Sequence, residues 1–134
     1  VIAAGGIVDR RGVAAAFALG ASAVQLGTAY LLCPEATTSR VHRAALMDEG
    51  SSHTALTNLF SGGLARGIVN RLMREIGPVN VLASPFPLGS SALAPLRAAA
   101  ERAGSGDFSP LWAGQGAFEG RSVGAAALTR GLMA

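Results

Sequence analysis

Apolar residues in the first thirty positions fall into two short runs separated by a segment with helical spacing. The runs are Val1–Ala4 and Ser22–Leu26, and the segment between them, Arg10–Leu19, places apolar side chains three and four residues apart. Runs of this length suit buried strands, and a helix between them is the usual crossover between parallel strands. We therefore predict a β–α–β unit at the start of the chain.

Each predicted strand ends at a glycine turn. Gly5 and Gly6 follow the first strand, and Gly27 and Thr28 follow the second. The carboxyl ends of parallel strands lie at one edge of the sheet, which is where ligands bind in open α/β folds. Glycine lets backbone N–H groups turn toward a ligand, so the two turns predict a phosphate site.

The pattern becomes more helical after Pro34. Helical spacing predicts helices over Glu35–Met47, Ala65–Ile76, Ala92–Ala103 and Gly124–Met133, and the β-branched piece His53–Phe60 predicts a strand or an extended segment. The coarse organisation is therefore a β–α–β front, a mostly helical middle and a short return segment.

Composition points to an α/β protein that continues beyond this sequence. Hydrophobic residues make up 50% of the 134 residues, and the first residue, Val1, lies in an expected strand. A lone β–α–β unit leaves its strand edges uncovered, so we expect a fragment of a longer protein. No apolar run approaches the roughly 20 residues that span a bilayer, and no secretion signal opens the chain, so the expected location is cytoplasmic, without a membrane partner.

Charge excludes one class of function. The net charge is +3 and every cationic residue is arginine, but the basic residues form no cluster interleaved with aromatic ones, which make up 5% of the chain. A nucleic-acid partner is therefore not expected. The small positive bias would help to attract an anion, although scattered surface arginines do the same.

The residues that most often carry chemistry give weak signals here. His42 lies between two arginines on a predicted helix, which favours a solvated face over a catalytic base, and His53 is expected in an exposed or capping position. Cys33, the single cysteine, precedes a proline and suits a small core residue. No spacing typical of metal ligands occurs, so no metal is predicted. Glu119 and Arg121 are expected on the surface.

Five segments resemble, in this order, the carboxyl-terminal half of the nitronate monooxygenase family, formerly called 2-nitropropane dioxygenases. They are AAGGI at 3–7, GASAVQLGTAYL at 20–31, FSGGLARGIVN at 60–70, SPFPLG at 84–89 and LWAGQG at 111–116. The resemblance covers nearly the whole chain. A GGI turn alone is common among phosphate-binding barrels, whereas the ordered set is more specific.

The resemblance implies an α/β fold, namely the carboxyl-terminal part of a TIM (β/α)8 barrel with an inserted small, mainly helical domain. Residues 1–33 would carry the last two barrel strands and their phosphate turns. Residues 34–110 would form the small substrate or lid domain, and residues 111–134 the return segment and terminal helix. Turns after the last two strands are the usual phosphate site of such barrels.

The resemblance also implies FMN as the cofactor. Gly5, Gly6, Gly27 and Thr28 would hold its phosphate, and Gln25 would reach the phosphate or the ribityl chain. Gln115 would lie in a late segment that returns to the cofactor.

Near the substrate, Trp112 either lines the pocket or packs between domains, and Arg66 or Asn70 either orients the nitro group or links helices. The family's catalytic histidine lies outside this sequence.

The implied activity is the oxidation of alkyl nitronates by molecular oxygen, with this chain supplying the phosphate site and lid of a longer enzyme that needs its amino-terminal half. Two alternatives remain open. A flavin-dependent enoyl-acyl-carrier-protein reductase shares the AAGGI and GASAVQ patterns, although the GQG segment favours the monooxygenase. The chain could also be a non-catalytic, truncated fragment.

Overall fold

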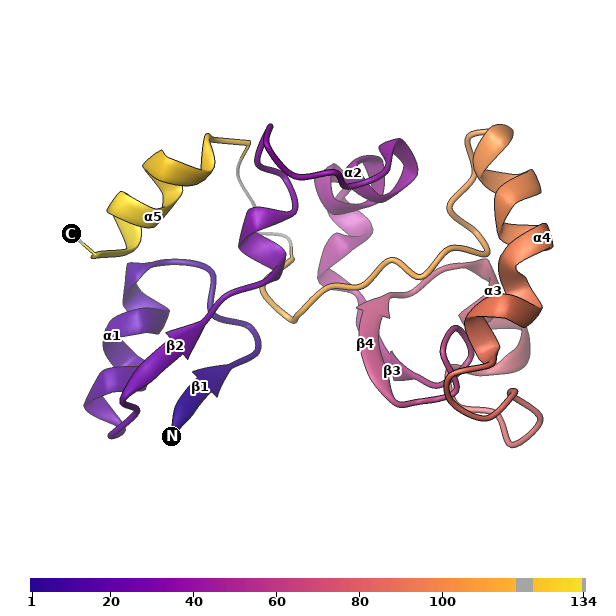
Figure 1. Cartoon of the computed structure of the whole chain (residues 1–134), viewed down its shortest axis with the longest axis horizontal. Helices are drawn as coiled ribbons and strands as arrows, with labels where there is room; N and C mark the ends of the chain where they lie inside the picture. The colour runs from indigo at the N-terminus through magenta and orange to yellow at the C-terminus, as the bar shows by residue number, and fades with distance from the viewer. Residues whose placement is uncertain (118–121, 134) are drawn as a thin grey trace.

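The computed structural model describes residues 1–117 and 122–133, in which two small sheets are separate, one at the left of Figure 1 and the other right of its centre. β1 (Ile2–Ala4) and β2 (Ala23–Gln25) pair in parallel, and β3 (Thr54–Thr57) and β4 (Ala65–Ile68) pair antiparallel. The helices are α1 (Arg10–Ala18), η1 (Thr28–Tyr30), α2 (Arg40–Met47), η2 (Glu49–Ser52), α3 (Arg71–Ile76), α4 (Gly89–Arg102) and α5 (Ala125–Met133).

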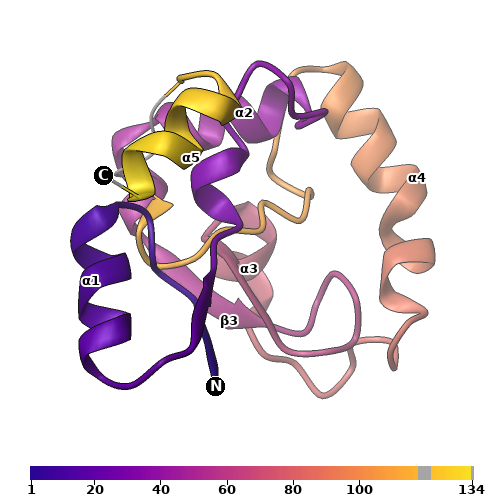
Figure 2. The same ribbon diagram turned by 60° about the vertical axis from the view of Figure 1, so that its left-hand side comes forward.

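The predicted β–α–β unit is confirmed. Ile2 lies opposite Ala23 and Ala4 opposite Gln25, so the two strands end together at the same edge. α1 connects them and begins where Asp9 accepts a hydrogen bond from the Gly12 N–H at 3.0 Å. α5 returns to lie beside α1, which brings the two ends of the chain to one side of the molecule (Figures 1 and 2).

The predicted helix over Ala65–Ile76 is wrong in its first half. Ala65–Ile68 is strand β4, paired with β3 from Thr54 opposite Ile68 to Thr57 opposite Ala65, and α3 begins only at Arg71. Asn70 causes the break, because its side chain caps α3 by accepting from the Met73 N–H. Four residues that fit a helical period also fit a half-buried strand, and the partner strand decides between the two.

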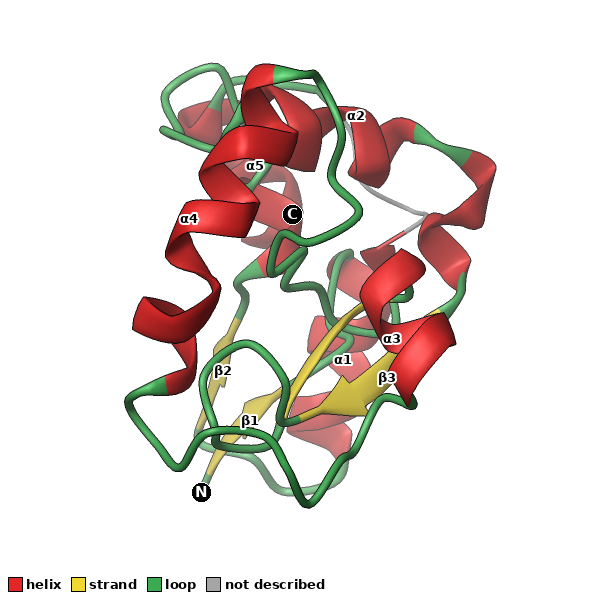
Figure 3. Ribbon diagram, turned by 90° about the vertical axis from the view of Figure 1, so that its right-hand side faces the viewer, coloured by secondary structure: helices red, strands yellow, loops and turns green. Residues whose placement is uncertain are grey.

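The helix predicted over Glu35–Met47 begins later, at Arg40, because Ser39 accepts a hydrogen bond from the His42 N–H and starts it there. The two later helices, α4 and α5, lie close to their predicted positions. Helices form most of the regular structure between Pro34 and Pro110, as predicted, but this stretch also contains the β3–β4 hairpin, which lies beside α3 (Figure 3).

Residues 111–117, which we call the crossing segment, join the two sides of the molecule. Leu111 accepts a hydrogen bond from the Ile68 N–H at 2.8 Å, and Ala113 donates to the Arg66 carbonyl at 3.1 Å, so the segment runs along β4. Its buried side chains then join one core cluster, which consists of Leu32, Leu46, Ile68, Leu111, Ala113 and Ala117. A second cluster of Leu59, Phe60 and Met73 packs against Trp112.

Cys33 is buried with 1% of its surface exposed, which confirms it as a core residue. Glu119 and Arg121 lie outside the described residues, as does part of the predicted return segment 111–134. Within residues 1–117 and 122–133, no helix combines the length and apolar character needed to cross a membrane.

Candidate functional site

The turns after β1 and β2 line one hollow of about 220 Å³, which we call the turn hollow. Its wall consists of Ala4, Gly5, Gly6, Ile7, Val8, Gln25, Gly27, Thr28, Gly114 and Gly116. Five residues predicted from the sequence therefore lie around one space, namely Gly5, Gly6, Gln25, Gly27 and Thr28. The parallel register brings them together, since both strands end at the same edge.

Gly5 and Gly6 give the turn hollow its backbone donors. Their φ angles are +94° and +72°, in the left-handed region that side chains disfavour, and both residues are exposed. Among the described residues, no hydrogen bond uses either N–H as a donor. Consecutive N–H groups in such a turn form a concave site that suits an anion.

Thr28, in the turn after β2, adds a hydroxyl to the residues that line the turn hollow. Its Oγ1 accepts a hydrogen bond from the Gly114 N–H at 2.8 Å. A hydroxyl can accept and donate at the same time, so the Thr28 proton can still point to a ligand. Gly27 precedes η1, whose amino-terminal end has no side-chain cap, and Gly27 lines the hollow together with Thr28.

The amino-terminal end of α1 is capped by a side chain of the protein itself. The Asp9 carboxylate accepts hydrogen bonds from the Gly12 N–H and from the Arg11 guanidinium, and these bonds lower the pKa of Asp9 below its ordinary value of 3.8. A negative side chain therefore already faces the positive end of this helix. An anion in the turn hollow would be held by the two turns rather than by the first turn of α1.

Two glycines of the crossing segment, Gly114 and Gly116, complete the wall, and neither was among the site residues predicted from the sequence. A Cβ on Gly116 would lie 2.7 Å from Val8 Cγ1 and 3.0 Å from the Gly6 oxygen, so only glycine allows this approach. A Cβ on Gly114 would lie 3.2 Å from the Gly6 nitrogen. The alternating glycines of LWAGQG were the available signal. Gln115 between them is exposed and is not among the lining residues, although its Cβ would lie 4.0 Å from a Cβ on Gly6.

The three predicted substrate residues lie elsewhere. Arg66 donates to the Thr54 carbonyl at 3.3 Å and to its hydroxyl at 3.2 Å, which ties the two strands of the hairpin. The Trp112 ring meets Phe60 edge-on, with centroids 5.7 Å apart, so the packing alternative fits it better. Asn70 is buried and, besides capping α3, donates to carbonyls in the loop before the crossing segment.

The prediction that His42 lies on a solvated face is wrong. Its ring is half-buried, and Nε2 lies 3.0 Å from the Trp112 carbonyl oxygen. Burial lowers the pKa of His42 below its ordinary value of 6.5, and the hydrogen bond to that carbonyl opposes the change. His53, by contrast, is exposed as expected. The part of the chain that the structure describes contains no group of three or more His, Cys, Asp or Glu side chains that could hold a metal.

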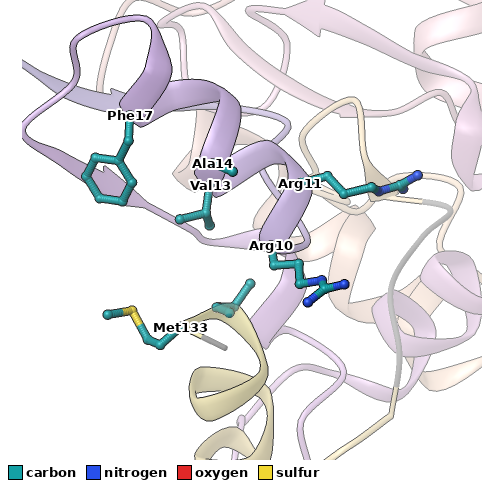
Figure 4. Close-up of a pocket in the computed structure, with 7 residues that line it drawn as sticks. Arg10, Arg11, Val13, Ala14, Phe17 and Met133 are labelled. Atoms are coloured by element: carbon teal, nitrogen blue, oxygen red, sulfur yellow. The ribbon is translucent and has the colours of Figure 1, made fainter.

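A larger hollow of about 420 Å³ lies between α1 and α5 (Figure 4). Val13 and Phe17 extend from α1 toward Met133 of α5, and the Arg11 side chain points away from it. None of the site residues predicted from the sequence lines this hollow. The candidate site is therefore the turn hollow, where backbone donors and a hydroxyl converge.

Comparison of the sequence with known proteins shows one family. A sequence model of the family described as nitronate monooxygenase matches residues 1–133. The nitronate monooxygenase of Pseudomonas aeruginosa is 46% identical over 134 residues, which cover 99% of this chain and 38% of the relative. The chain thus spans little more than a third of that protein's length.

Solved structures resemble the fold over nearly the whole chain. Nitroalkane oxidase from Streptomyces ansochromogenes matches with a TM-score of 0.89 and 41% identity, over 99% of this chain and 38% of that one. FabK from Thermotoga maritima matches with a TM-score of 0.72 and 29% identity, over 99% of this chain and 42% of that one.

Proposed function

Because this chain belongs to the nitronate monooxygenase family, we propose that its turn hollow binds the phosphate of FMN in an enzyme that oxidises alkyl nitronates with molecular oxygen. One observation carries the proposal: Gly5, Gly6, Gly27 and Thr28, from two different strand ends, line the same space. The nitroalkane oxidase match, at a TM-score of 0.89, supports oxidation of nitro compounds as the reaction class.

The turn hollow fits a phosphate monoester. Gly5 and Gly6 offer N–H groups that pair with no acceptor among the described residues, and Thr28 offers a hydroxyl from the turn after the second strand. FMN ends in a phosphate monoester, whose three terminal oxygens can accept hydrogen bonds from these groups. In FAD, each phosphate is esterified or bridged on two sides and has only two terminal oxygens. When bound, FMN supplies the redox chemistry, and the protein binds and orients it.

In the complete enzyme, we infer that β1 and β2, with α1 and α5, are the last two β/α units of a TIM barrel and that residues 34–110 form the inserted domain. The match to 38% of the P. aeruginosa relative supports this. The remaining strands and the catalytic histidine would come from the amino-terminal half, and the substrates would be a nitronate and oxygen.

The cofactor proposal is tested by titration with FMN, FAD and riboflavin. The titrations use two proteins. The first is this chain by itself. The second, which we call the graft, is the P. aeruginosa enzyme with its aligned segment replaced by this chain. We expect FMN to bind at least about tenfold more tightly than riboflavin, because a charged phosphate gains several hydrogen bonds. Thr28→Val should reduce that preference, and Thr37→Val, at an exposed threonine outside the turn hollow, should not. Equal binding of FMN and riboflavin by both proteins would contradict the phosphate site.

The reaction is tested with the graft under nitrogen. Propionate 3-nitronate should bleach the yellow flavin absorbance, and air should restore it. Bleaching by NADH or NADPH with no response to the nitronate would instead favour the enoyl-acyl-carrier-protein reductase, which stays a second candidate because FabK matches with a TM-score of 0.72. A graft that binds no flavin would favour the non-catalytic fragment.

A further inference from the structure

The two segments that meet at the Thr28–Gly114 hydrogen bond are both held by neighbouring residues of α2. His42 bonds to the carbonyl of Trp112, and Arg43 bonds to the chain that follows Thr28. We propose that His42 and Arg43 are positioning residues that hold the turn hollow in its phosphate-binding shape. The inference rests on the proposed function and assigns these two residues a part in it.

Arg43 holds the chain on the Thr28 side. Its guanidinium donates to three carbonyl oxygens, of Leu32 at 3.0 Å, of Cys33 at 2.7 Å and of Ala36 at 2.7 Å. A planar arginine fork can serve several acceptors in fixed directions, which a lysine ammonium cannot reproduce. Successive turns link this stretch to Thr28, because Leu31 donates to the Thr28 carbonyl and Cys33 to the Tyr30 carbonyl.

His42 holds the crossing segment on the Gly114 side. Three successive polar groups of that segment bond to three different elements. The Trp112 carbonyl accepts from His42 of α2, the Ala113 N–H donates to Arg66 of β4, and the Gly114 N–H donates to Thr28 of η1. Since Nε2 faces a carbonyl oxygen, it must carry the proton in this contact.

The two contacts hold the segments whose hydrogen bond constrains the Thr28 hydroxyl. The Gly114 N–H occupies one side of Oγ1, so the hydroxyl proton is turned to other directions, including the turn hollow. If the crossing segment moved away, Thr28 would lose this constraint. Gly116 would also lose its close approach to Val8, and the wall formed by the segment would open.

The test compares two replacements of similar length. His42→Gln can place an N–H donor near the Nε2 position, and His42→Met cannot. In this chain without flavin, Trp112 is the single tryptophan, so its fluorescence reports directly on the residue that His42 holds. We expect His42→Met to shift the Trp112 emission and to increase its quenching by acrylamide, and His42→Gln to leave both near wild type.

Flavin affinity is then measured in the chain and in the graft. His42→Met and Arg43→Lys should each weaken the affinity for FMN about five- to tenfold, the typical effect of losing one or more hydrogen bonds. The affinity for riboflavin should stay almost unchanged. Arg40→Lys is the matched control, because Arg40 lies exposed on the same helix, and it should change neither affinity.

The outcomes separate the two proposals. Wild-type protein that does not prefer FMN over riboflavin would contradict the proposed function and the positioning role with it. If His42→Met and Arg43→Lys keep the wild-type preference for FMN over riboflavin, the positioning role alone is overturned. The same holds if these variants lose affinity for FMN and riboflavin equally. Retained preference in His42→Gln with loss in His42→Met would support it.

Discussion

Gly5 and Gly20 adopt nearly the same backbone conformation, with φ of +94° and +92°, and a Cβ on either would meet no atom within 4 Å. Only Gly5 lines the turn hollow. The two residues therefore form a matched pair. A side chain at either position strains the backbone, but only a side chain at Gly5 would also occupy space in the turn hollow.

We expect Gly5→Ala and Gly20→Ala to lower the free energy of unfolding by similar amounts, about 1–2 kcal/mol each, because an L-residue disfavours the left-handed region. Only Gly5→Ala should also weaken the affinity for FMN, by about tenfold or more, because its methyl group would enter the space of the phosphate. Chemical denaturation and flavin titration of both variants measure the two effects. Equal flavin affinity in the two variants would contradict the assignment of Gly5 to the site.

His42 should make the stability of the chain depend on pH in the weakly acidic range. Its pKa in the folded protein is lowered by burial, so between that value and about 6.5 the unfolded chain binds more protons than the folded one. The free energy of unfolding should therefore fall as the pH falls through this window and stay constant, as far as His42 is concerned, above it.

The measurement is the melting temperature of wild type and His42→Gln from about pH 8 to about pH 5. The difference between the two proteins should change on the acidic side, with the wild type losing more stability as the pH decreases. Parallel curves for the two proteins would show that His42 does not titrate differently in the folded state.

At the scale of the elements, Asn70 and Ser39 both cap helices, but they do so in different surroundings. Ser39 is exposed and accepts from the His42 N–H at the start of α2. Asn70 is buried, accepts from the Met73 N–H at the start of α3, and donates to the carbonyls of Gly106 and Ser109. Asn70 thus ties β4, α3 and the loop before the crossing segment.

Ser39→Ala should lower the free energy of unfolding by about 1 kcal/mol, the usual effect of losing a cap. Asn70→Ala should lower it by about 3 kcal/mol, because the buried Ser109 carbonyl also loses its hydrogen bond from Asn70 and the half-buried Gly106 carbonyl keeps only the Ser109 N–H as a donor. Denaturant titration of both variants gives the comparison. A smaller loss for Asn70→Ala than for Ser39→Ala would mean that the loop is held by other contacts.

At the scale of the whole molecule, apolar side chains are exposed on both sides. Ile2 in β1 is 65% exposed, and Val81 and Leu82 in the loop before α4 are 97% and 88% exposed. β1 and β2 form a parallel sheet of two strands, and parallel sheets are normally covered on both faces. We therefore expect this chain alone to bind a hydrophobic dye and to self-associate as its concentration rises.

The graft should bind less dye per molecule and unfold at a higher temperature, because the rest of a barrel would cover β1 and its neighbours. Dye fluorescence and light scattering at matched concentrations test this expectation. A chain that remains monomeric and binds no dye would contradict the inference that these surfaces are buried in a longer protein.

The sequence by itself determined the features that depend on neighbours along the chain. The strands around Ala3 and Val24, the helix capped by Asp9 and the two glycine turns were predicted correctly because each follows from local spacing and turn chemistry. The ordered motifs also indicated the family. Four of the residues predicted to bind the phosphate, Gly5, Gly6, Gly27 and Thr28, do lie together around the turn hollow.

Only the tertiary structure decided what depends on distant partners. Ala65–Ile68 fits a helical period but forms a strand, because β3 offers it four paired positions. His42 looked solvated between two arginines, yet its Nε2 hydrogen-bonds to the carbonyl oxygen of Trp112, 70 residues away. Gly114 and Gly116 became part of the site because the crossing segment passes against Gly6 and Val8. Local spacing contains no information about such contacts, because chain folding alone brings the partners together.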